Sequence, residues 1–184
     1  MLSRKDADDL HRRLKGLISE TDRAIISEET DKEHDVWRLD VKHGHYVVNI
    51  YHPFQQRWIQ ISLSFQFNLS EAQKTILEEI YKNPTNRFEF DHGLRSSLTT
   101  PTTFYSINYD KTDNNIDIPS GFAAGIKLFP LDDSFSIQRL ENSIQNVVSA
   151  GSLGHNFLAS VLRVGEMSIK QQEAFASSPE GMYL

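Results

Sequence analysis

Cysteine is absent from the 184-residue chain. Disulfides, thiolate metal sites and cysteine nucleophiles are therefore excluded. No run of 18 apolar residues occurs, so we expect no transmembrane helix and no membrane partner. The amino-terminal stretch MLSRKDADDLHRR lacks the apolar core of a secretory signal. We therefore expect a cytoplasmic protein.

Positive charge is in the minority. The chain has 19 Lys and Arg against 25 Asp and Glu, for a formal net charge of −6. This balance argues against a general binder of phosphate backbones, so we expect no nucleic-acid partner. With 39% hydrophobic and 24% charged residues, the composition is typical of a globular chain that can bury a core.

Signatures of catalysis are also missing. No H-E-x-x-H motif occurs, and the glycines at 121–125 are not followed by the Gly-Lys-Ser/Thr of a phosphate-binding loop. The Gly-Ser-x-Gly at 151–154 has the wrong spacing for a nucleophile elbow. His43 and His45 flank a predicted turn, so their side chains diverge. We expect no enzyme: no catalytic residue, no metal site and no cofactor.

What the chain does contain is a three-strand meander over residues 36–67. Apolar and polar residues alternate from Trp37, which is the period of a half-buried strand. His43-Gly44 predicts a two-residue turn, and 53–56 predicts a four-residue loop. With these turns Val41 faces Tyr46 and Ile50 faces Ile59. The register places one apolar set on the core face: Trp37, Leu39, Val41, Tyr46, Val48, Ile50, Ile59, Ile61, Leu63 and Phe65.

The opposite face of the meander is polar except for one predicted row, formed by Val36, Tyr51 and Trp58. Cross-strand aromatic pairs stabilise a sheet, so the row has a purely local interpretation, as does cover by a neighbouring segment. The alternative is an apolar contact patch for a partner or second subunit. Val36, Tyr51 and Trp58 are therefore the candidate partner-binding residues.

Two helices are predicted beside the meander. Ser3 can cap the first, with Leu10, Leu14, Leu17 and Ile18 at helical spacing, and Ser70 can cap the second, which Asn83-Pro84 ends. Between the first helix and the meander we expect a short extended segment at 24–27 and a charged loop at 28–35.

The later chain is predicted from the same signals. We expect strands at 87–90, 104–109 and 115–118, a polar loop at 99–103, and a strand or helix approach at 126–129. Asp133 or Ser134 can cap a long helix in which Gly151 and Gly154 predict a break or a kink. A short helix can follow at 168–176, and 177–184 is expected to be mobile.

This order predicts an α+β fold with an antiparallel sheet, arranged as N-terminal helix, three-strand meander, helix, two or three further strands and C-terminal helices. We expect a single α+β domain over 1–164. Residues 165–184 would form a C-terminal tail, partly helical or mobile.

The pattern from Leu10 to Leu162 resembles the fold of type III secretion chaperones and of YbjN-like proteins. The segments WRLDVKHGHYVVNIYHP, RWIQISLSFQFNLSEAQKTIL and FYSINYD look most like an uncharacterised archaeal domain family with this fold. The resemblance implies binding of other proteins, often as dimers, and no activity by virtue of the fold.

Two function classes follow. The first is a non-catalytic protein-interaction or chaperone-like module with a protein partner or self-association, including a possible homodimer. The second is a small-ligand or lipid-binding domain with a pocket between the sheet and the helices, suggested by the large apolar face of the meander.

Overall fold

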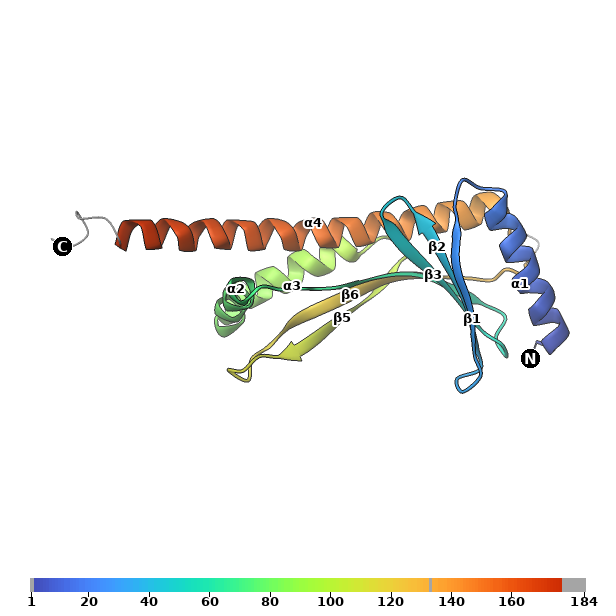
Figure 1. Ribbon diagram of the computed structural model, residues 1–184, viewed down its shortest axis with the longest axis horizontal. Coiled ribbons are helices and arrows are strands. Elements are labelled where there is room, and N and C mark those ends of the chain that lie inside the picture. Colours follow the sequence, from blue (N-terminus) through green and yellow to red (C-terminus); the bar gives the residue numbers. More distant parts are fainter. Residues whose placement is uncertain (1, 133, 177–184) are drawn as a thin grey trace. The chain divides into compact units, whose positions relative to one another are not determined.

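The computed structural model describes residues 2–132 and 134–176. This part of the chain forms four helices and one six-stranded sheet with strand order β1-β2-β3-β4-β6-β5 (Figure 1). The α+β class with an antiparallel sheet is as predicted. The elements are α1 (Arg4–Ser19), β1 (Ile25–Asp31), β2 (Val36–His43), β3 (Tyr46–Pro53), β4 (Ile59–Gln66), α2 (Glu71–Lys82), α3 (Pro84–Leu98), β5 (Phe104–Lys111), β6 (Asp117–Leu128) and α4 (Ile137–Ala176).

The described residues divide into two compact units. Unit 1 draws on 2–64, 98–106 and 123–151, and unit 2 draws on 65–97, 107–122 and 152–176. The predicted division into a domain at 1–164 and a tail at 165–184 stays a prediction. The expected mobile end, 177–184, lies outside the described residues.

Helix α1 of unit 1 forms as its sequence predicts. Ser3 is the N-cap, and its hydroxyl accepts a hydrogen bond from the Asp6 backbone N–H at 3.2 Å. Leu10, Leu14 and Ile18 follow at helical spacing and are buried, so one face of α1 belongs to the core.

The meander is confirmed, but both predicted turns are shifted. Val41 lies opposite Val48, not Tyr46, and Ile50 lies opposite Ile61, not Ile59. The first turn consists of Gly44 and His45 rather than His43-Gly44. Gly44 has φ +60°, and glycine is needed at the first central position of a type II′ hairpin turn.

The cross-strand pairing differs from the predicted one by two residues. Such a shift leaves each side chain on its predicted face, because the side-chain period of a strand is two. The predicted core face is therefore buried despite the wrong partners, except at its ends, where Tyr46 and Phe65 are half-buried. One residue of this face was not predicted: His52 follows Val48 and Ile50 in the alternation, lies opposite Trp37 and is fully buried.

The predicted charged loop at 28–35 is wrong in its first half. Glu28 to Asp31 continue strand β1, which pairs with β2 from Ile25↔Val41 to Asp31↔Val36. Pairing with the meander overrides the weak strand propensity of the acidic residues. Charged side chains are also well tolerated on an edge strand, where they oppose pairing with other chains.

Helix α4 contradicts the predicted break. It runs unbroken past Gly151 and Gly154, although each glycine costs roughly 1 kcal/mol relative to Ala. Buried side chains on both sides of the glycines, Val147, Val148, Leu158 and Leu162, offset that cost. The cap is Ser136, whose hydroxyl accepts from the Arg139 backbone N–H at 3.3 Å. The predicted cap Ser134 is therefore wrong, and Asp133 lies outside the described residues.

In unit 2 the predicted helix after Ser70 is confirmed as α2, with a capping box between Ser70 and Gln73. The predicted strand at 87–90 is wrong, because these residues belong to α3. The Asn83 side-chain oxygen accepts from the Thr85 and Asn86 backbone N–H groups at 2.9 and 3.2 Å. Pro84 then occupies the first helical position, where its missing N–H costs nothing.

The strand predicted at 104–109 is confirmed as part of β5. Of the strand predicted at 115–118, only Asp117 and Ile118 belong to β6, because Asn115 lies in the turn with φ +59°. The hairpin of β5 and β6 is closed by the Thr112 backbone N–H, which donates to the Ile116 carbonyl at 3.0 Å. Strand β6 continues to Leu128, so the segment at 126–129 is strand except for its last residue. The short helix predicted at 168–176 is the end of α4.

Candidate functional site

The solvent face of unit 1 is the side of the sheet opposite the core face. The register across the strands aligns Glu29 with Arg38, Arg38 with Tyr51, and Tyr51 with Gln60. One row of side chains therefore crosses β1 to β4 on this face.

The predicted row of Val36, Tyr51 and Trp58 is not formed. Val36 lies opposite Pro53, and the neighbours of Tyr51 are Arg38 and Gln60. Trp58 precedes β4 and is two residues from Gln60, which makes it a diagonal neighbour of Tyr51. All three predicted residues lie on the solvent face and are half-buried. Whether they bind a partner stays a prediction.

Asp40 is the polar centre of the solvent face. Its carboxylate accepts hydrogen bonds from Arg38 Nε and Nη2 at 2.7 and 3.0 Å, from Ser27 Oγ at 2.8 Å and from Asn49 Nδ2 at 2.7 Å. Burial alone would raise the pKa of Asp40, but the hydrogen bonds from Arg38, Ser27 and Asn49 outweigh it and lower the pKa. The same contact raises the pKa of Arg38, so the pair stays ionised.

Tyr51 and Trp58 on the solvent face each have a cation over the ring. The Arg38 guanidinium carbon lies 5.8 Å from the Tyr51 ring centre, and the Lys127 ammonium lies 4.4 Å from the Trp58 ring centre. The Phe67 backbone N–H donates to the Ser120 carbonyl at 2.9 Å, and this ladder places Lys127 opposite Gln60. The row thus runs from Glu29 in β1 to Lys127 in β6.

A third aromatic ring depends on a glycine. Gly125 precedes Lys127 by two residues and shares its face. A Cβ at Gly125 would lie 2.7 Å from the Phe104 Cζ and 3.1 Å from the Ile61 carbonyl oxygen. The Phe104 ring, which is 41% exposed, therefore packs against Gly125 at a place that a side chain would otherwise occupy. Sequence reasoning treated this glycine only as part of a rejected phosphate loop and missed the contact.

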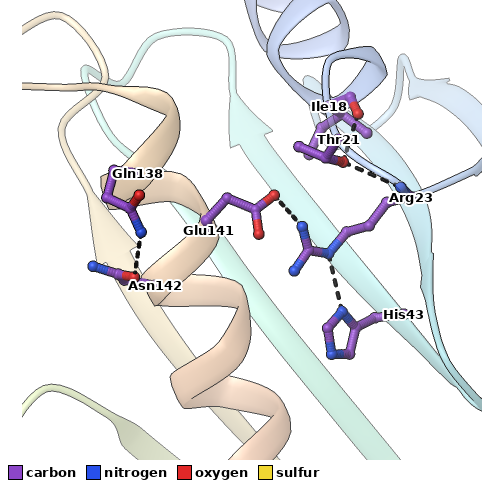
Figure 2. A network of polar contacts seen from close by, with 7 residues as sticks. All are labelled: Ile18, Thr21, Arg23, His43, Gln138, Glu141 and Asn142. Carbon is purple, nitrogen blue, oxygen red and sulfur yellow. Dashed lines mark hydrogen bonds and ion pairs between the residues drawn. The ribbon is translucent and has the colours of Figure 1, made fainter.

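A second polar network lies near the β2–β3 hairpin end of unit 1 (Figure 2). The Arg23 guanidinium donates from Nε to His43 Nδ1 at 3.0 Å and forms an ion pair with Glu141 on α4. Burial and the Arg23 charge lower the pKa of His43, so its imidazole is the neutral acceptor. Residues around it, including Lys42 and Gln138, line a cleft of about 580 Å³.

The core face holds a buried histidine pair. His11 Nε2 and His52 Nδ1 are 2.7 Å apart, and His52 Nε2 lies 2.9 Å from the Gln56 carbonyl. A carbonyl can only accept, so His52 Nε2 carries a proton, its Nδ1 accepts, and His11 Nε2 donates. The His11 ring stacks on Trp37 at 4.0 Å, and Trp37 Nε1 donates to Glu28 at 2.9 Å.

Both imidazoles are held neutral. Burial, followed by the nearby His52, lowers the pKa of His11 to about 4, and burial also lowers the pKa of His52. The sequence held the signal for this pair: His11 lies on the apolar stripe of α1, and His52 lies on the core side of β3. It was missed because only exposed, metal-type histidine spacings were considered.

Unit 2 contains its own polar cluster. The Tyr81 hydroxyl donates to Asp91 Oδ1 at 2.5 Å, the Tyr109 hydroxyl lies 3.4 Å from the same oxygen, and Arg87 Nε is 4.0 Å from Asp91 Oδ2. Burial, with the Asp91 contact, raises the pKa of Tyr81. The arrangement fixes α2 against α3, and Tyr81 stays a neutral donor.

An open cleft of about 780 Å³ in unit 2 is lined by α2 and the β5–β6 hairpin. Its lining is mostly polar, and Glu78 there accepts from Asn114 Nδ2 at 2.6 Å. Across residues 2–132 and 134–176, no three His, Asp or Glu side chains gather in a group able to hold a metal ion. None of the described helices combines the length and apolar character needed to cross a membrane.

Comparison with known proteins identifies a similar fold. No family model and no curated protein matches the chain. A crystal structure of an uncharacterized protein from Methanothermobacter thermautotrophicus is similar, with a TM-score of 0.64 and 19% sequence identity. The alignment covers 82% of this chain and 97% of that one. This likeness shows the fold alone, and the neighbour is an uncharacterised archaeal protein, as the sequence resemblance implied.

Proposed function

We propose that the protein is a non-catalytic protein-interaction module that binds its partner through the solvent face of unit 1. The observation that supports this most is the pairing of Tyr51 with Arg38 and of Trp58 with Lys127 on one side of the sheet. Tyr, Trp and Arg are the residues enriched in interface cores and among the side chains that dominate binding energy.

The surface is also ordered before any partner arrives. Asp40 fixes Arg38 through two hydrogen bonds, and Arg38 in turn lies over Tyr51. Association costs roughly 0.5–1.5 kcal/mol for each flexible side chain that it immobilises. Side chains already held in place avoid most of that cost, which favours binding over a merely exposed aromatic residue.

The proposal includes the finer expectations drawn from the sequence. A chaperone-like fold and a protein partner rest on the resemblance, a cytoplasmic location on the amino-terminal stretch, and the exclusion of nucleic acid on the net charge. A function without catalysis rests on the resemblance and on the missing catalytic motifs.

The test is affinity capture from the native host with the wild-type chain and two variants. The double variant Tyr51→Ser/Trp58→Ser removes both rings and is expected to lose the captured protein, including any second copy. Phe88→Ser is the matched control, because Phe88 is 70% exposed but lies in unit 2. Equal capture by the double variant, with its folding verified by circular dichroism, would move the binding surface elsewhere.

A small-ligand function is the second candidate, and the unit 2 cleft of about 780 Å³ is the observation in its favour. Its lining includes Lys74, Glu78, Thr112 and Asn114, which suits a polar ligand better than a lipid. A ligand screen by thermal shift tests it. Glu78→Gln should weaken a genuine ligand of this cleft, and a ligand indifferent to that change binds elsewhere.

A further inference from the structure

We infer that the partner fitting the solvent face is a second copy of this chain, related by a two-fold axis through Tyr51. The inference rests on the proposed function and names its partner. Its basis is the order of side chains in the row across five strands: Glu29, Arg38, Tyr51, Gln60 and Lys127.

Tyr51 is the midpoint of this row. Neighbouring strands are about 4.8 Å apart, so Glu29 in β1 and Lys127 in β6 each lie roughly 9.6 Å from Tyr51, on opposite sides. A two-fold axis that runs parallel to the strands and passes over Tyr51 therefore places Glu29 of one copy against Lys127 of the other, and Arg38 against Gln60. An interface between identical subunits needs this self-complementarity, because the same patch is used twice.

The end charges of the row are the ones available for pairing. Arg38 is already neutralised by Asp40. By contrast, within residues 2–132 and 134–176 no ion pair shorter than 4.0 Å is formed by Glu29 or Lys127, and both side chains are exposed. In the two-fold arrangement Glu29 of each copy faces Lys127 of the other, so that the dimer contains two such pairs of opposite charges.

The size of the face is compatible with a specific but weak dimer. Strands β2 to β4 have eight residues each, and four strand spacings separate β1 from β6. At about 3.3 Å per residue and 4.8 Å per strand, the face measures roughly 26 by 19 Å, or about 500 Å² on each copy. The total of about 1,000 Å² is at the lower limit for a biological interface, so we expect dissociation in the micromolar range.

Charge exchange at the two ends tests the register of the dimer. Analytical ultracentrifugation across a concentration series should show a monomer–dimer equilibrium for the wild type. Lys127→Glu or Glu29→Lys alone should raise the dissociation constant about tenfold, because each places like charges together twice. The double variant Glu29→Lys/Lys127→Glu restores opposite charges between copies and should return to within about threefold of wild type.

Glu33→Lys is the matched control, since Glu33 is exposed in the β1–β2 turn and lies outside the row; it should leave the dissociation constant unchanged. Circular dichroism verifies that each variant is folded. A wild-type monomer at all concentrations overturns the inference, as does a double variant no better than the single ones. The proposed function fails separately, if Tyr51→Ser/Trp58→Ser alters neither the dimer nor any captured partner.

Discussion

The two faces of the sheet in unit 1 treat ionisable groups in opposite ways. On the core face, His11 and His52 share a hydrogen bond and are held neutral. On the solvent face, Asp40 is also substantially shielded, with its side chain 14% exposed, yet its pKa is lowered and it stays charged. Burial therefore does not decide the charge by itself. The hydrogen bonds that Asp40 accepts from Arg38, Ser27 and Asn49 outweigh its burial, whereas Glu28 near His11 and the Gln56 carbonyl at His52 do not outweigh the burial of the imidazoles.

The largest difference between the faces should appear on removing one tryptophan from each. Trp37 is 2% exposed, stacks on His11 and donates to Glu28, so Trp37→Ala should lower the free energy of unfolding by about 3–5 kcal/mol. Trp58→Ala should cost about 1 kcal/mol, since the ring is half-buried under Lys127. Urea unfolding measures both. Similar losses would mean that the two faces are equally part of the core.

The histidine pair should make stability depend on pH. Unfolded histidines bind protons below about pH 6.5, whereas folded His11 does so only near pH 4. Stability is therefore fully present above about pH 6.5 and falls as the pH decreases toward 4, by on the order of 2–3 kcal/mol.

Chemical denaturation at several pH values measures this loss. The double variant His11→Gln/His52→Gln should show a shallower decline over the same interval, whatever its stability at neutral pH. His45→Gln is the control: His45 is exposed in the turn, and the slope should be unchanged. A slope equal to wild type in the double variant would assign the acid sensitivity to other groups.

The polar centre of the solvent face gives an effect of about 2 kcal/mol. Asp40→Ala leaves the Arg38 guanidinium and the Asn49 amide without their acceptor. A donor left without its hydrogen-bond partner lowers the free energy of unfolding by about 1–3 kcal/mol. A double-mutant cycle with Arg38→Ala separates the pair from the packing: the double variant should be less destabilised than the sum of the single ones. Strict additivity in thermal unfolding would show that the two side chains contribute independently.

The core face was predictable from the sequence because it needs only a period of two. Val48, Ile50 and Ile61 are buried as expected, even though both turns were placed one residue from their true positions, which displaces the cross-strand pairing by two residues. Predicting which side chains are neighbours on the solvent face, by contrast, requires the correct cross-strand register. The same two-residue error put Val36, Tyr51 and Trp58 in one row, where the chain instead aligns Arg38, Tyr51 and Gln60.

Long-range contacts account for most of the remaining errors. Glu28 to Asp31 form a strand because β2 offers a ladder, not because acidic residues favour strands. Lys127 in β6 contacts the ring of Trp58, which lies 69 positions earlier in the chain, and no local pattern predicts this contact. The strand predicted at 87–90 is a different case, since Asn83-Pro84 is a local helix start that was interpreted only as a stop.

The smallest predicted effect concerns the tolerance of the solvent face. Gly125→Ala places a methyl group 2.7 Å from the end of the Phe104 ring and 3.1 Å from the Ile61 carbonyl. A half-exposed ring can move, whereas the backbone yields little, so we expect a loss of about 1 kcal/mol in thermal unfolding. Phe104→Ala should recover most of it in the double variant, because it removes the atom that the methyl group meets first. No recovery would mean that the Ile61 backbone sets the cost, and then the solvent face would be packed as tightly as the core face beneath it.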